Sequence, residues 1–228
     1  MVHVPMIAAA MLASTTVAPA QPVLTPVAVI QAHSVTNAGE HVIVRVPKTA
    51  TYVGSDRFDL YGVADAEMHV FVEADASKRV KKLYWIQFER YWPSKPDLTH
   101  DYTGDRRTQQ WGTTTWLRGG PSSTAGTPRP GSDTEHARAI LERARYTAPP
   151  EVMNLRLVQL LDDPKGTGHG RNELMLIYSE DLAPTGKTLA ELTTDGKPNA
   201  SWAPIEKGLV ERATKAFSVE RKQAAKND

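Results

Sequence analysis

The alternation of polar and apolar residues is clearest in residues 80–92, VKKLYWIQFERYW, which hold five of the chain's aromatic side chains. Successive side chains of a strand point to opposite faces of a sheet. One face of this segment has an apolar middle formed by Tyr84, Ile86 and Phe88. The segment is longer than the usual strand of about five or six residues, which predicts a central strand that is bent or bulged. The other face mixes large rings with an amide and a carboxylate: Trp85, Gln87, Glu89 and Tyr91.

Shorter alternating segments flank this strand. Residues 41–46 place Val42, Val44 and Val46 on one side of a strand, and Pro47 ends the pattern. Residues 58–74 predict a hairpin or one long bent strand, and their second half runs through a short polar link into the central strand. Residues 68–92 therefore predict an antiparallel hairpin.

The middle of the chain alternates between polar loops and a strand. Residues 93–107 predict a polar loop, and the Thr- and Trp-rich residues 109–118 predict a strand in which Gly112 marks a bulge. Residues 119–131, GGPSSTAGTPRPG, are typical of a mobile surface loop, either a lid or a plain connection.

Two segments carry a helical period. In residues 132–145, Ser132 and Glu135 form a capping box and an apolar stripe follows them. Residues 204–221 place Ile205, Leu209 and Ala213 on one face of a second helix. Between them, residues 152–161 and 173–180 predict strands, and residues 189–192 predict a short helix.

These elements predict an α+β fold: a mainly antiparallel sheet of about six strands with two amphipathic helices packed on it. The order strands, helix, strands, helix also resembles the α/β/α layering of PsbP-like domains, a resemblance of element order and not of residue motifs. The expected organisation is a linker or arm at 21–40, one domain at 41–221 and a polar tail at 222–228.

Residues 1–20 are typical of a signal peptide. An apolar run at residues 6–17 is followed by Ala18-Pro19-Ala20, the small residues that signal peptidase accepts. The segment before the run has no Lys or Arg, which departs from the standard pattern. We expect a bacterial periplasmic or secreted protein, with no transmembrane anchor after cleavage.

Composition narrows the classes of function. The chain has no cysteine, which excludes disulfides, thiol nucleophiles and cysteine-ligated zinc. Its 27 basic and 26 acidic residues give a net charge of +1, without the basic surplus expected of a nucleic-acid-binding protein.

Familiar catalytic motifs are missing. There is no G-x-S-x-G elbow and no H-E-x-x-H pair, and the G-K-T at 186–188 has Asp181 where a phosphate loop needs glycine. The sequence assigns no cofactor and no metal ligands. A non-adjacent site such as His100 with Asp101 and Asp105 stays open, with solvated loop residues as the alternative.

The mixed face of the central strand is the remaining candidate. Large rings with a few polar groups are typical of a small-molecule pocket. In the alternative interpretation a helix covers the apolar part of this face, and Gln87 and Glu89 reach solvent. The expected ligand-binding residues are Trp85, Gln87, Glu89, Tyr91, Arg118 and Arg156.

Two hypotheses follow from different classes. The first is a non-enzymatic protein that binds a small apolar ligand or an envelope protein partner through this face. The second is a hydrolase or lyase that uses His69 or His100 with Glu89 as acid and base. The missing motifs favour the first, and the sequence does not decide whether the protein is an enzyme.

Overall fold

The computed structural model describes residues 24–222. The expected signal peptide and all but the first residue of the expected polar tail lie outside this range.

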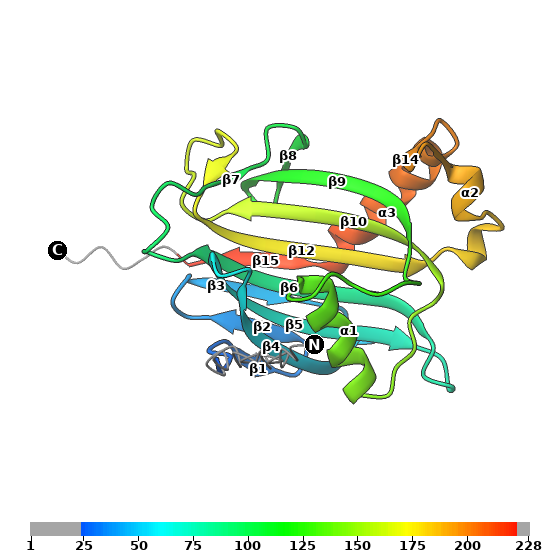
Figure 1. Cartoon of the computed structure of the whole chain (residues 1–228), viewed down its shortest axis with the longest axis horizontal. Helices are drawn as coiled ribbons and strands as arrows, with labels where there is room; N and C mark the ends of the chain where they lie inside the picture. Colours follow the sequence, from blue (N-terminus) through cyan, green and yellow to red (C-terminus); the bar gives the residue numbers. More distant parts are fainter. Residues whose placement is uncertain (1–23, 223–228) are drawn as a thin grey trace, which may run out of the picture.

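One large antiparallel sheet organises the described chain (Figure 1). It has seven strands where the sequence predicted about six: residues 58–74 and 109–118 each span a two-stranded hairpin, and the strand predicted at 41–46 belongs to a separate sheet. In spatial order the seven strands are β4 (Thr51–Leu60), β5 (Ala64–Ala74), β6 (Val80–Tyr91), β12 (Asn172–Asp181), β10 (Glu151–Leu160), β9 (Thr113–Ser123) and β8 (Arg106–Gln110).

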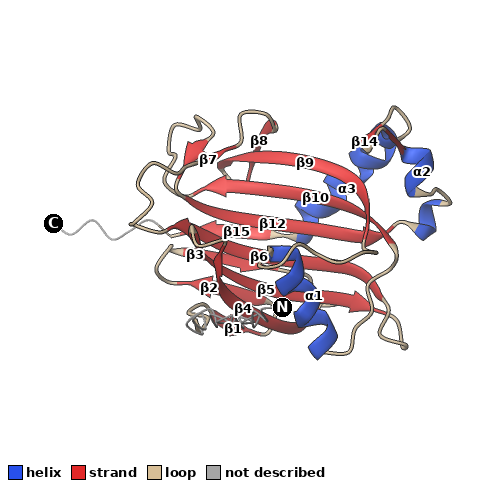
Figure 2. Ribbon diagram, in the orientation of Figure 1, coloured by secondary structure: helices blue, strands red, loops and turns tan. Residues whose placement is uncertain are grey.

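Helices lie on both faces of this sheet (Figure 2). We call the face that carries α1 (Asp133–Arg143) the front face. The rear face carries α3 (Trp202–Ala216) and a second sheet of four strands. Its strands are β1 (Val29–Gln31), β2 (Ser34–Asn37), β3 (Val42–Arg45) and β15 (Ser218–Arg221).

Short elements complete the described chain. The strands β7 (His100–Asp101) and β11 (His169–Gly170) pair with each other, as do β13 (Thr193–Thr194) and β14 (Lys197–Pro198). The helix α2 (Leu189–Leu192) follows a 3₁₀ turn at Ala183–Thr185.

The alternation places the side chains of β6 on two faces, and each face belongs to its own core in the structure. Tyr84, Ile86 and Phe88 belong to the rear core, whereas Trp85 belongs to the front core. Both cores are apolar where they meet the sheet, and this burial is the main source of stability. Val80 is an exception to the alternation: it lies in the front core, because the register between β5 and β6 shifts beside it.

Three boundaries differ from the predictions. Residues 29–37, within the expected linker, form β1 and β2. The helix expected at 204–221 ends at Ala216, and the chain then turns into β15, which pairs with β3. The strand β9 continues to Ser123, so only the second part of the expected loop at 119–131 is irregular.

The structure also changes the interpretation of Gly112. Trp111 and Gly112 both have positive φ, at 51° and 76°, and form a two-residue turn between β8 and β9 in place of a bulge. Two consecutive positive φ angles are the signature of a type I′ hairpin turn.

The cap of α1 provides a first test of the local structure. The Ser132 hydroxyl accepts a hydrogen bond from the Glu135 amide, while the Glu135 carboxylate accepts one from Gly131 and not from Ser132. We expect Ser132→Ala to lower the free energy of unfolding by about 1 kcal/mol, measured by urea denaturation. Thr134→Ala, one residue inside the helix, is the control, and an equal loss there would contradict the capping role.

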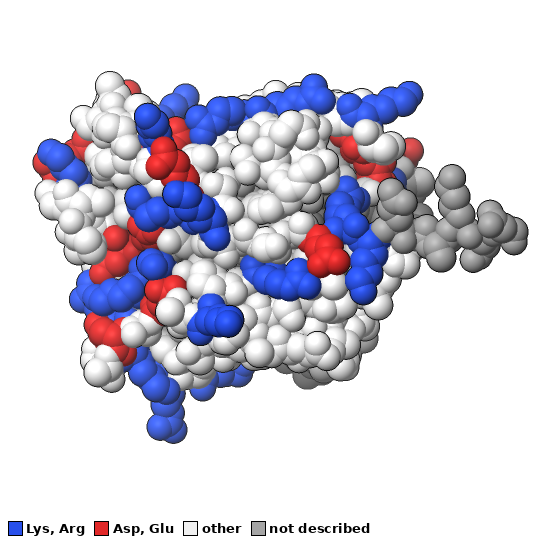
Figure 3. Space-filling model, turned by 180° about the vertical axis from the view of Figure 1, so that it is seen from behind, with Lys and Arg blue, Asp and Glu red and all other residues white. Residues whose placement is uncertain are grey.

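Within residues 24–222, no helix has the length and apolar character needed to span a membrane. On the rear surface, Lys and Arg lie along the top and both sides and also at several places across the middle, with acidic groups and uncharged surface between them (Figure 3).

Candidate functional site

A cleft of about 640 Å³ opens on the front face, between the sheet, α1 and the segment that precedes α1. Its floor is apolar and comes from three adjacent strands: Leu83 and Trp85 on β6, Ile177 on β12 and Val152 on β10. Leu141 of α1 closes one side. The volume lies in the range of about 300–1,000 Å³ that is usual for small-molecule sites.

Arginines line the cleft, but they differ in how far they are already engaged. Arg156 donates to Asp105 over 2.6 Å, and Arg138 donates to the carbonyls of Thr124 and Gly126. Arg118 lies 3.5 Å from the same Asp105, and its side chain is 70% exposed. Arg118 is therefore more available than Arg138 or Arg156 to an anionic group in the cleft.

A row of side-chain hydrogen bonds runs along β6 away from the cleft floor. The indole nitrogen of Trp85 donates to the Gln87 amide oxygen over 2.9 Å, and the Gln87 amide donates to Glu89 over 3.1 Å. The three side chains share the front face because they are two residues apart. Gln87 and Glu89 are buried, which contradicts the interpretation that they reach solvent.

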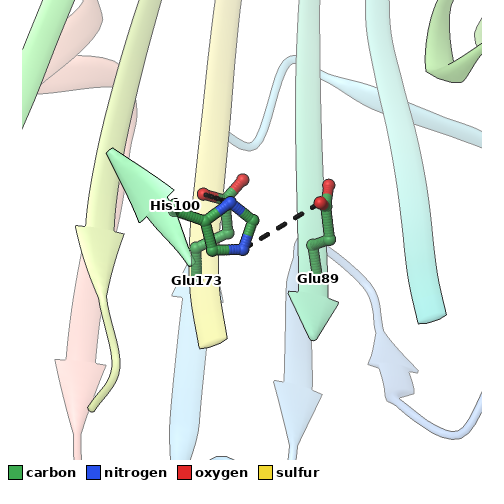
Figure 4. A group of neighbouring side chains, drawn as sticks. All are labelled: Glu89, His100 and Glu173. Carbon is green, nitrogen blue, oxygen red and sulfur yellow. Dashed lines mark ion pairs between the residues drawn. The ribbon is translucent and has the colours of Figure 1, made fainter. Parts of the chain in front are cut away.

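Glu89 ends this row inside a second feature, which we call the carboxylate–histidine cluster: Glu89, His100 and Glu173. Glu173 on β12 is the register partner of Glu89 on β6, so the two carboxylates project from the same face. The His100 ring lies between them (Figure 4). Its Nδ1 is 3.2 Å from Glu173 Oε2, and its Nε2 is 4.0 Å from Glu89 Oε1.

The loop between β6 and β8 brings His100 to the cluster. Its short strand β7 pairs with β11, so that His100 faces Gly170. Arg171 then fixes the loop, because its guanidinium donates to the carbonyls of Trp92, Lys95, Pro96 and Leu98. The Tyr91 ring packs on His100 with centroids 4.5 Å apart.

Burial controls the ionisation of the cluster. It raises the pKa of both Glu89 and Glu173, and each gains further from nearby negative charge, which for Glu173 is chiefly the charge of Glu89. A hydrogen bond of 2.6 Å from the Tyr102 hydroxyl opposes the rise at Glu173. Burial also lowers the pKa of His100 to about 4, which favours a neutral imidazole.

The structure divides the six expected site residues into two groups. Trp85, Arg118 and Arg156 line the cleft. Gln87, Glu89 and Tyr91 lie beyond it, toward the carboxylate–histidine cluster.

Sequence reasoning did not assign Tyr102 to a site, and it treated Glu173 only as part of a polar turn whose oxygen ligands follow no EF-hand pattern. Glu173 is a lone carboxylate at the start of an otherwise apolar run, and that isolation was the available signal.

The other residues that the sequence grouped with Glu89 or His100, namely His69, Asp101 and Asp105, lie outside the carboxylate–histidine cluster. His69 lies on the rear face beside Glu67 and not near Glu89. Asp105 binds arginines and Asp101 is exposed, where it accepts hydrogen bonds from Thr103. Neither aspartate joins His100 in the cluster.

Comparison of this chain with protein-family models, with curated proteins and with solved structures found no match. The site must therefore be interpreted from its own geometry.

Proposed function

We propose that this chain is an exported, non-enzymatic binding protein that holds a small, largely apolar molecule with an anionic group in the front cleft. The observation that carries the proposal is the cleft itself, in which an apolar floor lies beside an arginine that is still available. Apolar area supplies affinity in such sites, and a few polar groups set orientation.

Position and chemistry support this occupant. Trp85 is nearly buried yet is part of the cleft floor, so part of its side chain can contact a ligand without first having to be uncovered. Arg118 stands opposite Arg156 across β9 and β10, and a single aspartate is shared between their two positive charges. An anionic ligand group would balance this local excess of positive charge.

Export is part of the proposal. It rests on the apolar run and small residues within 1–20, and on the absence of cysteine. A bacterial envelope protein would meet amphipathic molecules of the proposed class. A protein partner held by the same face is the other occupant consistent with the sequence.

The hydrolase or lyase alternative has one supporting observation, the proximity of His100 to Glu89. Neither residue is among those that line the 640 Å³ cleft. A substrate in the cleft would therefore not contact this pair directly, and the geometry favours binding.

Native mass spectrometry of the gently purified protein tests the proposal first. A reproducible additional mass that disappears on organic extraction would identify the ligand class. If the protein carries no additional mass and gains none from a cell-envelope lipid extract, the small-molecule proposal fails and the partner alternative takes its place.

Two fluorescent probes test the role of Arg118. Anilinonaphthalene sulfonate is apolar and anionic, whereas N-phenylnaphthylamine is apolar and neutral. We expect Arg118→Ala to weaken sulfonate binding by about two- to fivefold, since exposed ion pairs contribute up to about 1 kcal/mol. Binding of the neutral probe should not change.

Arg45→Ala is the matched control for this measurement, because Arg45 is partly exposed on the second sheet. It should leave both probes unaffected. Equal loss of both probes in Arg118→Ala would contradict a charge-specific role for that side chain.

A further inference from the structure

The carboxylate–histidine cluster is not explained by ligand binding in the cleft. Its three side chains come from β6, β7 and β12 and are almost fully enclosed: the exposed fractions are 10% for Glu89, 7% for His100 and 2% for Glu173. Buried carboxylates are costly unless a cation or hydrogen bonds compensate them.

Among the described residues, no Lys or Arg forms an ion pair with either carboxylate of the cluster. Arg156 acts electrostatically on Glu173, but its guanidinium donates to Asp105. Two facing carboxylates thus enclose one imidazole that is largely neutral, and neither has a Lys or Arg partner among the described residues. A carboxylate that ionises here is uncompensated in a region of low dielectric constant.

The imidazole itself provides a second, independent observation. His100 Nε2 is buried and has no hydrogen-bond partner among the described residues. Figure 4 shows this nitrogen directed toward Glu89 across a gap of 4.0 Å. Buried polar atoms are rarely left without a partner, so the gap calls for an occupant that accepts an imidazole lone pair.

We propose that the cluster is a metal site for one divalent first-row transition ion, with Zn²⁺ as the best-fitting probe, bound by His100 Nε2, Glu89 and Glu173. One oxygen from each glutamate and one imidazole nitrogen already lie within 4.8 Å of one another. Bonds of about 2.0–2.2 Å around tetrahedral Zn²⁺ hold ligand atoms roughly 3.3 Å apart, so an inward shift of an ångström or so would complete the site.

The donor set selects the class of ion. An imidazole ligand disfavours Ca²⁺ and Mg²⁺, which take oxygen donors, and the absence of thiolate and thioether donors disfavours Cu⁺. Three protein ligands leave a fourth position for water or a small ligand.

Neighbouring side chains would hold these ligands in place. The Tyr102 hydroxyl donates to Glu173, and the Gln87 amide donates to Glu89. Such outer contacts orient metal-binding carboxylates, and their loss typically reduces metal affinity by about 10–100-fold.

Metal titration tests the proposal on the untagged full chain after removal of metals with a chelator. We expect one equivalent of Zn²⁺ to bind in competition with a chromophoric chelator, and Co²⁺ to give a visible d–d absorption band. Glu173→Gln preserves the shape of the side chain but removes its charge. We expect it to weaken Zn²⁺ binding by at least about 100-fold, because a direct ligand contributes more than an outer contact.

Two further variants make the result specific. Tyr102→Phe should weaken binding by about tenfold. His169→Ala removes an exposed histidine on the strand next to His100 and should leave affinity unchanged. If Glu173→Gln does not give the native circular dichroism spectrum, Glu89→Gln is expected to show the same loss of affinity.

Three results would overturn the proposal: no stoichiometric Zn²⁺ binding to the wild-type chain, equal binding by wild type and the glutamine variants, or loss of binding in His169→Ala. The first two outcomes would leave a proton shared by the facing carboxylates as the explanation of the cluster. Binding of N-phenylnaphthylamine reports on the cleft and should be the same in wild type and Glu173→Gln. Failure of the metal proposal can therefore be distinguished from failure of the proposed function in the cleft.

Discussion

Replacing Trp85 with alanine should lower the free energy of unfolding by about 3–5 kcal/mol, the usual cost of truncating a buried Trp to Ala. The side chain is 7% exposed and belongs to the front core. Its loss also removes the indole donor to Gln87, which is completely buried. The same variant should lose binding of N-phenylnaphthylamine, because the largest apolar side chain among Leu83, Trp85, Val152 and Ile177 of the cleft floor disappears.

Trp92→Ala is the matched control, since Trp92 lies outside the cleft and its indole nitrogen donates to Asp59. Urea denaturation and probe titration of both variants separate folding from binding. Trp85→Phe should retain part of the affinity at a smaller cost in stability. Wild-type probe affinity in a folded Trp85→Ala variant would show that the cleft is not the binding site.

The regular parts of the fold could be predicted because local and tertiary preferences agree there. The alternation of residues 80–92 assigned β6 to the centre of a sheet, and the structure places it there, with a core on each face. The apolar stripe behind Ser132 likewise predicted α1, whose Ile140 and Leu141 are buried. Apolar residues recur at regular spacings in strands and amphipathic helices, so these elements can be predicted from a single sequence.

The prediction of α3 was wrong at its end because a strand pairing with a segment far away in the sequence ends the helix there. Phe217 continues the apolar stripe of α3, so the sequence favoured a longer helix, yet Val219 pairs with Val44 from the other end of the chain. The turn at Trp111 was missed for a different reason. Positive φ is uncommon for an aromatic residue, so the sequence offered only Gly112 as a turn signal.

The candidate site was partly predictable for the same reasons. Glu89 and Trp85 were assigned to one face by their spacing alone. The partnership of Glu89 with Glu173 depends on the register between β6 and β12, which no local pattern specifies. His100 reaches the cluster through a loop fixed by Arg171, and loop positions have no period from which they could be predicted.

A second buried histidine–glutamate pair explains why part of the expected N-terminal arm is ordered. Glu67 is on the rear face of β5, and its carboxylate accepts hydrogen bonds from the amides of Val27 and Ala28 at 2.9 and 2.7 Å. The same carboxylate lies 2.9 Å from His69 Nε2. Glu67 thereby attaches the segment before β1 to the main sheet.

Glu67→Gln should lower the free energy of unfolding by about 2–4 kcal/mol at neutral pH, because the buried charge is lost and one of the two acceptor oxygens becomes an NH2 donor. The loss should depend on pH. Burial pushes the pKa of Glu67 upward, but hydrogen bonds from His69, Val27 and Ala28 outweigh it and hold the pKa below its usual value.

A carboxylate with a lowered pKa in the folded state stabilises the protein fully above its unfolded pKa of about 4.3, and this contribution is lost as the pH falls through the folded value. The difference between wild type and Glu67→Gln should therefore shrink as the pH falls from about 5 to about 3, measured by urea denaturation at each pH. Glu220→Gln, which removes a half-exposed ion pair with Arg45, should cost about 0.5 kcal/mol or less. A difference for Glu67→Gln that stays constant over this range would show that the carboxylate charge does not hold the N-terminal segment in place.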